Sequence, residues 1–487
     1  MNSLMQLYRP SLGLLTDLYQ LTMAYGYWKN GMAERESVFH LFFRTNPFKG
    51  GYAIAAGLEQ AIGLMEGLHF PQEDLDYLAT LTGNDGQPLF EQGFLNFLGK
   101  TEWACTVDGI PEGTIVFPHE PLLRIRGPLY QCQLLETSLL TVMNFQTLVA
   151  TKASRVCRAA SGDSVLEFGL RRAQGIDGGL SASRAAFIGG CNATSNVLAG
   201  KLYGIPVRGT HAHSWVMSFE TEMEAFEAYA HAMPNNCVFL VDTYDTIEGV
   251  QKAAKVGLWL KERGHKLAGI RLDSGDLGAL SIAARKILDE AGLPEARIVA
   301  SNDLDDSTIT ELKAQGAQIN IWGVGTKLAT SYDQPALGGV YKLGAIRGMD
   351  GEWDYKVKLS ENLIKVSNPG LLNVRRYFRD GKPVADMLCN QEQAAMEERI
   401  FDPLSATQFS PVPDHDAAED LLVPIFEKGK LVYALPSLEE IRNRSLAQQA
   451  TFPESVTALK PSAAYPFGLE EGLFNLKMQL IQKAKDQ

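Results

Sequence analysis

Residues 165–218 read VLEFGLRRAQGIDGGLSASRAAFIGGCNATSNVLAGKLYGIPVRGTHAHSWVMS, and this stretch decides the fold. Two short apolar runs, Val165–Phe168 and Ile205–Val207, are typical of buried strands. Each run ends in a polar cluster: Arg171 and Arg172 follow the first, and Thr210, His211, His213 and Ser214 follow the second. Because α/β proteins place their active sites at the C-terminal ends of parallel strands, any function has to be argued from this region.

Further strands and helices alternate on both sides of these clusters. The six strand candidates are Val165–Phe168, Ile205–Val207, Cys237–Val241, Leu267–Leu272, Arg297–Ala300 and Ile319–Trp322. Helical periodicity between them, as in 246–263 and 277–291, predicts parallel strands with right-handed crossovers. Nearly every strand ends in a polar cluster (FGLRR, RGTHAHS, VDTYDT, RLDSGDL, ASNDLDD and WGVGTK). This distribution favours an α/β fold with an irregular, closed or nearly closed (β/α) barrel over an open sheet.

The segments before and after the alternating region have a different pattern. A helix is predicted to begin at Thr16 and Asp17, and a strand at 38–44, within a separate α+β N-terminal domain. Past residue 345, two hairpins (376–388 and 423–436) precede two helices (437–448 and 469–485). We expect this tail to pack back on the N-terminal domain, because a hairpin needs a partner for its apolar face. The predicted domains are therefore 1–128, the barrel at 129–345, and the C-terminal hairpins and helices at 346–487.

Composition narrows the class of protein. A hydrophobic content of 45% and a charged content of 21% are those of a folded globular chain. The net charge of −12 disfavours a nucleic-acid surface, and no apolar run is long enough to span a bilayer. Six scattered cysteines without a C-x-x-C pair, and no recognisable signal peptide, lead us to expect a soluble cytoplasmic protein.

The histidine cluster Gly209–Ser214 suggests a catalytic group. Two of the eight histidines of the chain lie two residues apart at a strand end, between a threonine and a serine. A structural role and a two-histidine metal site are the alternatives, but the sequence nearby offers no obvious third metal ligand. The pattern favours a general base or a nucleophilic histidine.

Three other clusters suggest anion and metal binding. Asp273 and Asp276 of RLDSGDL suit Mg²⁺, although Asp276 or Ser274 also suits an N-cap of the next helix. Gly325 and Thr326 of GVGT suit either a phosphate or a plain tight turn. Arg171 and Arg172 suit a clamp on a carboxylate or phosphate, or a surface ion pair.

Five segments in register closely resemble the nicotinate phosphoribosyltransferase family. They are TDLYQLTMAY (16–25), EFGLRRAQG (167–175), GTHAHSWV (209–216), RLDSGDL (271–277) and GVGTKL (323–328), and the tail with PSLEEIRNRSL is similar to that of longer members. The resemblance implies ATP-dependent condensation of nicotinate with 5-phosphoribosyl 1-pyrophosphate, an entry step to NAD. It also implies an irregular barrel, Mg²⁺, and a homodimer with its active site at the subunit interface.

Carried over residue by residue, the resemblance assigns roles to this chain. His213 matches the phosphorylated histidine and, with Asp273, is implied to be catalytic. The implied nicotinate-binding residues are Tyr19, Phe168, Arg171, Thr210 and Arg271, with Tyr19 reaching in from the neighbouring subunit. The implied phosphoribosyl pyrophosphate-binding residues are Ser214, Asp273, Gly325 and Thr326, and the implied metal ligands are Asp273 and Asp276. His211 falls at a variable position and is not expected to be modified.

Two other readings of the sequence remain open. A relative that uses nicotinamide would need a group that hydrogen-bonds a neutral amide, and one that uses quinolinate would need further basic residues near the ring. A catalytically silent barrel acting as a binding protein is disfavoured by the presence of His213, Asp273 and both arginines.

Overall fold

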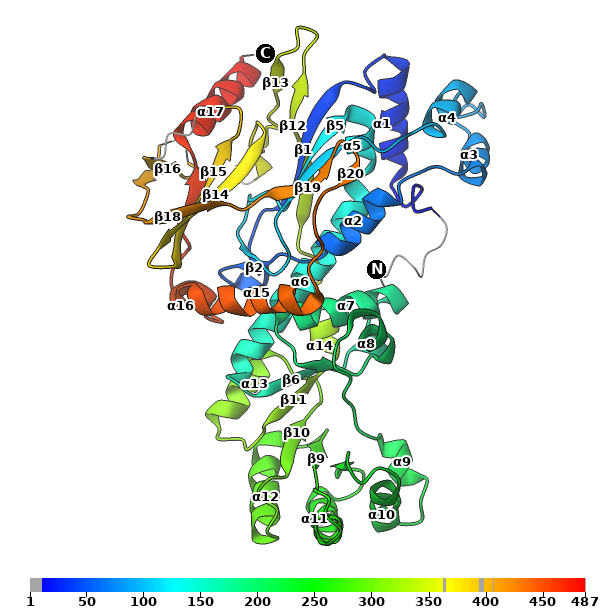
Figure 1. Ribbon diagram of the computed structural model, residues 1–487, viewed down its shortest axis with the longest axis vertical. Coiled ribbons are helices and arrows are strands. Elements are labelled where there is room, and N and C mark those ends of the chain that lie inside the picture. Colours follow the sequence, from blue (N-terminus) through cyan, green and yellow to red (C-terminus); the bar gives the residue numbers. More distant parts are fainter. Residues whose placement is uncertain (1–10, 362–364, 394–397, 406, 487) are drawn as a thin grey trace. The chain divides into compact units, whose positions relative to one another are not determined.

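The computed structural model describes residues 11–361, 365–393, 398–405 and 407–486 (Figure 1). The chain forms two compact units. Unit 1 combines the chain up to Leu148 with the chain from Ala336 onward, and unit 2 is the continuous segment Val149–Pro335. Unit 2 is thus inserted between the two segments that build unit 1.

Unit 2 is built on a six-stranded sheet in which every pairing is parallel. Its spatial order is β7 (Ala193–Thr194), β6 (Ser164–Glu167), β11 (Ile321–Val324), β10 (Arg297–Ala300), β9 (Gly269–Leu272) and β8 (Val238–Leu240). Val165, Phe239, Ile270, Ile298 and Trp322 are fully buried within it, which explains the apolar runs of the sequence. The alternation of strands and helices that the sequence predicts is therefore confirmed here.

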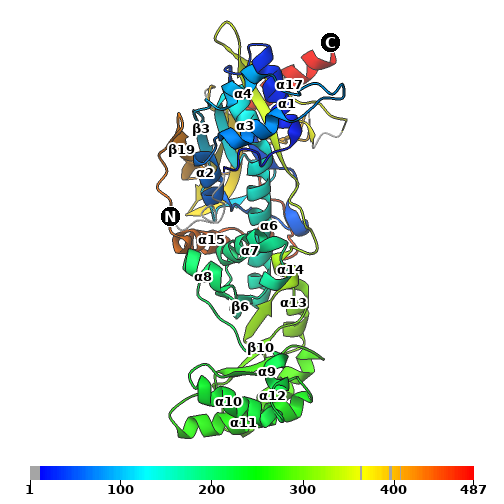
Figure 2. The ribbon, with the colours of Figure 1, turned by 90° about the vertical axis from the view of Figure 1, so that its right-hand side faces the viewer.

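Helices connect these strands as expected for parallel pairing. They include α7 (Gly175–Gly189), α11 (Thr246–Glu262), α12 (Leu277–Glu290) and α13 (Asp306–Ala314). Helix α11 lies between α10 (Glu222–Ala232) and α12, and α11 and α12 pack against β9 (Figure 1; Figure 2 shows the same helices from another side). Strands β7 and β8 are the two edges of the sheet, and no pairing joins them within the described residues. The mixed α/β fold is present, whereas barrel closure is not confirmed.

One predicted strand, Ile205–Val207, is wrong. This segment makes a single parallel bridge between Val207 and Thr194, and β7 takes the place beside β6. Two backbone hydrogen bonds join the segment to Thr194, one accepted by the Pro206 carbonyl and one donated by the Arg208 N–H. Ile205 is buried, but Pro206 has no N–H to donate and Val207 is exposed, so the pairing stops at an edge bridge.

Unit 1 contains a seven-stranded sheet that mixes both ends of the chain. Its order is β13 (Trp353–Tyr355), β12 (Gly339–Arg347), β1 (Glu36–Phe43), β5 (Leu123–Pro128), β3 (Thr106–Gly109), β19 (Val423–Glu427) and β20 (Lys430–Leu431), with antiparallel pairing throughout. A second sheet has the order β17 (Phe409–Pro411), β16 (Arg399–Phe401), β21 (Phe467–Leu469), β15 (Lys382–Asn390), β14 (Leu372–Arg379) and β18 (Ala417–Asp420). The hairpin β19–β20 thus shares a sheet with N-terminal strands, whereas the hairpin β14–β15 lies in a sheet of C-terminal strands and shares only the core.

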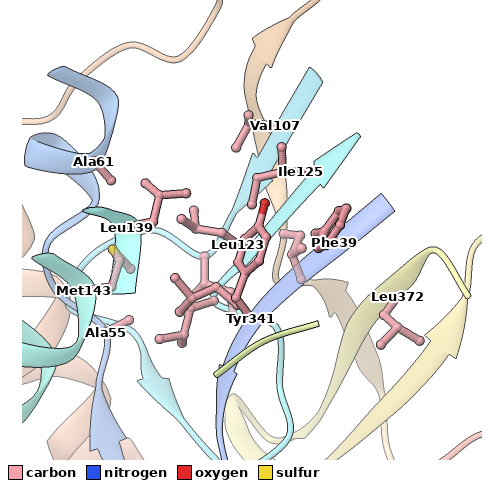
Figure 3. Packing of buried hydrophobic residues seen from close by; sticks show 14 of the residues in the cluster. Phe39, Ala55, Ala61, Val107, Leu123, Ile125, Leu139, Met143, Tyr341 and Leu372 are labelled. Carbon is pink, nitrogen blue, oxygen red and sulfur yellow. The ribbon is translucent and has the colours of Figure 1, made fainter. Parts of the chain in front are cut away.

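The core of unit 1 joins these strands to helices α2 (Leu58–Glu66) and α6 (Glu136–Ala160). Figure 3 shows Phe39, Leu123 and Ile125 of the sheet facing Leu139 and Met143 of α6, with Tyr341 between them. The rings of Phe39 and Tyr341 stack with centroids 5.0 Å apart, and the buried Tyr341 hydroxyl donates to the Cys132 carbonyl (2.7 Å).

Residues 129–160 form two helices, α5 (Leu129–Leu134) and α6, separated at Leu135. Because the first part of α6 packs in the core of unit 1, the compact units change over at 148/149 and 335/336. The domain boundaries at 128/129 and 345/346 stay predictions of the sequence. No helix among the described residues is both long and apolar enough to cross a bilayer.

Candidate active site

The candidate site lies along the C-terminal ends of β6, β11, β10, β9 and β8, which we call the rim of unit 2. Arg271, on β9, is its central residue. Its guanidinium donates to Ser301 Oγ (2.8 Å), Thr210 Oγ1 (3.1 Å) and Asp273 Oδ1 (2.8 Å). Ser301 also donates to Asp273 Oδ1. Two predicted nicotinate-binding residues, Thr210 and Arg271, and the predicted catalytic Asp273 therefore lie together.

Phe168 brings an aromatic ring to the same place. It follows β6 and continues the parallel ladder by donating its N–H to the Val324 carbonyl (2.8 Å). The Arg271 guanidinium carbon lies 6.0 Å from the centroid of its ring. A Cβ on Gly323 of β11 would lie 2.7 Å from the same ring, so only glycine leaves the ring its position. Cation and ring thus meet at one point of the rim.

His213 begins the short helix α9 (His213–Met217) and faces the ends of two strands. Its Nδ1 lies 3.1 Å from Thr243 Oγ1, and its Nε2 lies 3.8 Å from Asp273 Oδ2. Partial burial by itself would raise the pKa of Asp273, but the hydrogen bonds from Ser301 and Arg271 outweigh it and hold that pKa below its usual value. The imidazole therefore has a hydroxyl on one nitrogen and an anionic carboxylate near the other.

His211 lies two residues from His213 but has a different environment. It is buried among the rings of Phe226, Tyr229 and Phe239, and its Nε2 accepts the Leu240 N–H (3.3 Å). Burial lowers its pKa, which keeps the ring neutral. His211 packs α10 onto β8, whereas His213 stands at the rim.

Asp242, which follows β8, was not singled out from the sequence. Its Oδ2 accepts the Asp273 N–H (2.9 Å) and the Ser274 hydroxyl (2.6 Å), while its buried Oδ1 has no hydrogen-bond partner in the described chain. Ser301 was missed in the same way. Both belong to polar clusters visible at strand ends, VDTYDT and ASNDLDD. Each is the first polar residue after its strand, and this position is the signal that could have identified it.

The remaining predicted residues of unit 2 are placed as follows. Asp276 is the N-cap of α12, since its Oδ1 accepts the Ala279 N–H (3.0 Å). Gly325 and Thr326 begin the short helix α14 (Thr326–Ala329) directly after β11. Ser214 is exposed on α9, and Arg171 is exposed on the 3₁₀ turn Leu170–Arg172. No group of three or more His, Cys, Asp or Glu side chains with metal-site geometry occurs in the described ranges.

Tyr19 belongs to unit 1. It lies on α1 (Leu18–Lys29), the helix that the sequence predicts to begin at Thr16 and Asp17. Its side chain is 48% exposed, whereas the next residue, Gln20, is buried. A tyrosine exposed to that degree on a helix is available to a ligand or to a second subunit.

Comparison with known proteins gives matches over most of the chain. Sequence models described as the nicotinate phosphoribosyltransferase N-terminal domain, the nicotinate phosphoribosyltransferase family and its C-terminal domain match residues 14–144, 164–353 and 373–477. The nicotinate phosphoribosyltransferase of Bacillus subtilis is 43% identical over 486 residues, covering 98% of this chain and 96% of that protein. The human protein of the same name is 36% identical, with 94% and 95% covered.

This chain belongs to the nicotinate phosphoribosyltransferase family. The crystal structure of the human nicotinic acid phosphoribosyltransferase has a TM-score of 0.83 at 33% identity and covers 96% of this chain. A nicotinate-nucleotide pyrophosphorylase from Pyrococcus furiosus, at 22% identity and a TM-score of 0.69, shares the fold. In this nicotinate phosphoribosyltransferase family, the rim of unit 2 falls in the central region matched at 164–353, which also includes strand β12 of unit 1. Strands β1, β5 and β3 fall in the N-terminal region matched at 14–144, and β15 and β19 fall in the C-terminal region matched at 373–477.

Proposed function

We propose that this protein condenses nicotinate with 5-phosphoribosyl 1-pyrophosphate to give nicotinate mononucleotide and pyrophosphate, as a step of NAD biosynthesis. Family membership and near full-length similarity to nicotinate phosphoribosyltransferases support this activity. The observation that carries it is the Arg271 guanidinium facing the Phe168 ring, with Thr210, Asp273 and His213 on the same rim. A flat, anionic ring needs both an aromatic face and a cation, and this point of the rim offers both.

The proposed chemistry is a substitution at C1 of the ribose. The pyridine nitrogen forms a bond to C1 as the C1–O bond to pyrophosphate breaks, and the positive charge that develops on the sugar needs a nearby anion. Asp273, whose pKa is lowered, supplies a carboxylate on the rim at the pH of the cell. Phe168 and Arg271 position the nucleophile, which needs no activation other than orientation.

The residues also suit a divalent cation bound to the substrate phosphates. Mg²⁺ prefers carboxylate oxygens together with phosphate oxygens. Asp273 is the predicted ligand, and the unpartnered Oδ1 of the neighbouring Asp242 is the kind of buried oxygen that a cation satisfies. Asp276 is already used as a helix cap through Oδ1, so it has one oxygen left to offer. The bound ion would neutralise charge on the departing pyrophosphate.

We further propose that His213 couples ATP to this reaction as a phosphohistidine. Thr243 lies against Nδ1, so Nε2 is the ring atom that attacks the γ-phosphorus of ATP. The N–P bond forms as the bond from that phosphorus to the β,γ-bridging oxygen breaks, and ADP leaves. Ser214, Gly325 and Thr326 lie at the starts of short helices on the rim, where N–H groups and hydroxyls can contact phosphates. Hydrolysis of the phosphohistidine then returns the free imidazole and releases phosphate.

Mass spectrometry of protein incubated with ATP tests this coupling. We expect one phosphate on the wild-type peptide that contains residues 211 and 213, its retention in His211→Asn, and its loss in His213→Ala. Steady-state assays should show that ATP stimulates the wild type and not His213→Ala. Equal stimulation of both proteins would refute the coupling.

Competition among pyridines tests the substrate. We expect nicotinate to be converted in preference to nicotinamide and quinolinate, because Arg271 is a cation suited to one carboxylate. Release of pyrophosphate with nicotinamide as the preferred substrate would overturn the assignment. The same assay separates an enzyme from a binding protein that has no turnover.

We also propose a cytoplasmic homodimer in which Tyr19 of one subunit completes the site of the other. Tyr19→Ala and Arg271→Ala should each be nearly inactive alone. If the site is shared, mixing the two variants under exchange conditions restores activity, because one of the two sites in a mixed dimer is intact. If subunits exchange and activity does not recover, the shared site is wrong. Tyr19 and Arg271 of the same chain would then serve one site, or Tyr19 would not belong to the site at all.

A further inference from the structure

Glu167, the last residue of β6, carries a buried carboxylate that the proposed chemistry does not use. The residue is 1% exposed, and no Lys or Arg lies within ion-pair distance in the part of the chain described. Its oxygens accept only from neutral donors: the Gly169 N–H on one side, and the hydroxyls of Ser183 (2.9 Å) and Thr194 (2.6 Å) on the other. Burying a carboxylate without a cation costs folding free energy, which only its hydrogen bonds offset. The residues that make these hydrogen bonds therefore indicate what the carboxylate does.

The first contact holds the turn that carries the predicted nicotinate-binding residues. Gly169 lies between Phe168 and the 3₁₀ turn Leu170–Arg172, and its carbonyl accepts the Arg172 N–H (2.8 Å). A Cβ at position 169 would lie 2.9 Å from Glu167 Oε1 and 3.0 Å from the Gly325 carbonyl oxygen. The absence of a side chain therefore lets the Gly169 N–H reach the carboxylate, which fixes the chain direction directly after Phe168.

The other two contacts anchor the carboxylate to neighbouring elements. Ser183 belongs to α7, and Thr194 ends β7. Asn196 connects them, since its Nδ2 donates to Ser183 Oγ (3.2 Å) and its N–H donates to Thr194 Oγ1 (3.0 Å). Asn196 also caps helix α8 (Val197–Tyr203) through the Ala199 N–H. One carboxylate thus ties the strand-end turn to two elements that the core holds rigid.

We propose that Glu167 is a positioning residue that sets nicotinate affinity by fixing the orientation of Phe168 and the turn bearing Arg171. This inference rests on the proposed function and adds a residue that touches no substrate. Its effect is transmitted through the Gly169 peptide, so it concerns binding of the pyridine ring and not the sugar chemistry, whose groups lie on β8, β9 and α9.

Glu167→Gln is the decisive variant because it preserves shape and removes one acceptor. An amide that keeps its oxygen on the Gly169 N–H turns its NH₂ toward the two hydroxyls, which must then change from donors to acceptors. Each hydroxyl already accepts from Asn196, so the network around the turn is weakened. We expect the KM for nicotinate to rise roughly tenfold, as for loss of a hydrogen bond to a charged group. The KM for phosphoribosyl pyrophosphate and kcat should stay within about threefold of wild type, a split that general loss of folding would not produce.

Glu222→Gln is the matched control. Glu222 is an equally buried acid of unit 2, 3% exposed and paired with Lys252 (3.1 Å) at the start of α10. It has no contact with the strand-end turn among its hydrogen bonds. We expect the KM for nicotinate to be unchanged in this variant.

Thr194→Val keeps the inference testable if Glu167→Gln fails to fold. It removes the 2.6 Å hydrogen bond to Glu167 and the bond that Thr194 Oγ1 accepts from the Asn196 N–H (3.0 Å), but it leaves the Gly169 contact in place. We therefore expect a smaller rise in the same KM. Combined with Glu167→Gln, the two effects should be less than additive. Unchanged KM for nicotinate in both variants, or a parallel rise of both KM values with a fall in kcat, would overturn the role of Glu167. Wild-type protein that neither binds nor converts nicotinate would instead refute the proposed function itself.

Discussion

Arg376 and Arg271 each pair with an aspartate, one inside unit 1 and the other on the rim of unit 2. Arg376 makes two parallel bonds to Asp386 (2.8 and 2.6 Å), and both side chains are at most 1% exposed. Arg271 makes one bond to Asp273 and spends its other donors on Ser301 and Thr210, with 15% of its side chain and 26% of that of Asp273 exposed.

The surroundings of each pair show what it can do. Asp386 also accepts from the Tyr465 hydroxyl (3.2 Å), and Arg376 donates to the Ile115 carbonyl (2.8 Å), so that pair is closed on all sides. The Arg271 pair is open toward an aromatic ring and a histidine. Two similar ion pairs therefore differ in role because one is completed by protein groups and the other leaves room for a ligand.

Arg376→Ala should have the largest effect of these variants on the stability of the protein. It leaves the fully buried Asp386 without its cation, so we expect a loss of about 3–5 kcal/mol in the free energy of unfolding, measured by urea titration. The double variant Arg376→Met with Asp386→Leu should recover most of this loss. A change below about 1 kcal/mol in the single variant would mean that the pair is not closed to water.

Arg271→Ala should have the reverse effect, with a large loss of activity and a small loss of stability. We expect kcat/KM for nicotinate to fall roughly 100- to 1,000-fold, because the cation of the rim is lost from the site where charge must be matched. The free energy of unfolding should change by only about 1 kcal/mol, since Asp273 is partly accessible to water and the buried Ser301 keeps its hydrogen bond to Asp273. Arg271→Lys keeps the charge without the planar fork, so an intermediate loss is expected. If Arg271→Ala does not fold, the Arg271 pair also stabilises the protein, and the proposed difference in role between the two ion pairs is wrong.

Acidification should destabilise unit 1 through its buried histidines. Burial, with the Arg124 charge, lowers the pKa of His40 to about 3, and burial with the charges of Lys477 and Arg44 lowers the pKa of His119 to about 4. Both titrate near their ordinary pKa of roughly 6.5 when unfolded, so stability is present above that pH and is lost as the pH falls toward the folded values. We expect a loss of about 2 kcal/mol per histidine between pH 7 and 5.

The control for this pH dependence is His40→Asn, in which the slope of unfolding free energy against pH should be shallower. His40 accepts the Leu372 N–H through Nε2 (3.2 Å), which a protonated ring cannot do. Asp273 of the rim stays ionised over the same range because its pKa is lowered, so it does not contribute to this slope. Equal slopes in wild type and variant would show that His40 does not limit acid stability.

Asp276→Asn should have the smallest effect and sharpens the metal assignment. Asparagine caps a helix about as well as aspartate, so the free energy of unfolding should change by less than about 0.5 kcal/mol. If Asp276 also binds Mg²⁺, the Mg²⁺ concentration for half-maximal activity should rise several-fold. An unchanged requirement leaves Asp276 as a cap alone.

Much of the rim could be predicted because most strands and their ends are visible in the sequence. Buried parallel strands read as apolar runs, and the residues at their ends meet at one edge, which brings Phe168, Arg271 and Asp273 together. Thr210 joins them although the run before it is not a strand of the sheet. The segment 205–207 misled because an apolar run with a proline resembles a strand while lacking a donor. The proline in that run was the available warning.

Contacts across the sheet could not be predicted in the same way. Glu167 reads as one charged residue in an apolar run, and its partners Ser183 and Thr194 are 16 and 27 residues away. Asp242 binds the Asp273 N–H, 31 positions further along the chain. Such pairs depend on the angle at which neighbouring strands end, which a period of two or of 3.6 residues does not encode. The fold class can be predicted from local sequence patterns, whereas the hydrogen-bond network of the rim depends on residues far apart in the sequence.

The insertion of unit 2 within unit 1 has a consequence for synthesis on the ribosome. Strand β1 is made early but lies between β5 and β12, and β12 emerges only after all of unit 2. Because domains fold as they leave the ribosome, the inserted unit can mature first while the edge of β1 waits unpaired for its C-terminal neighbours. A nascent chain that has emerged up to residue 335 would therefore hold a folded unit 2 and, in unit 1, an open edge of β1, the kind of surface that chaperones cover.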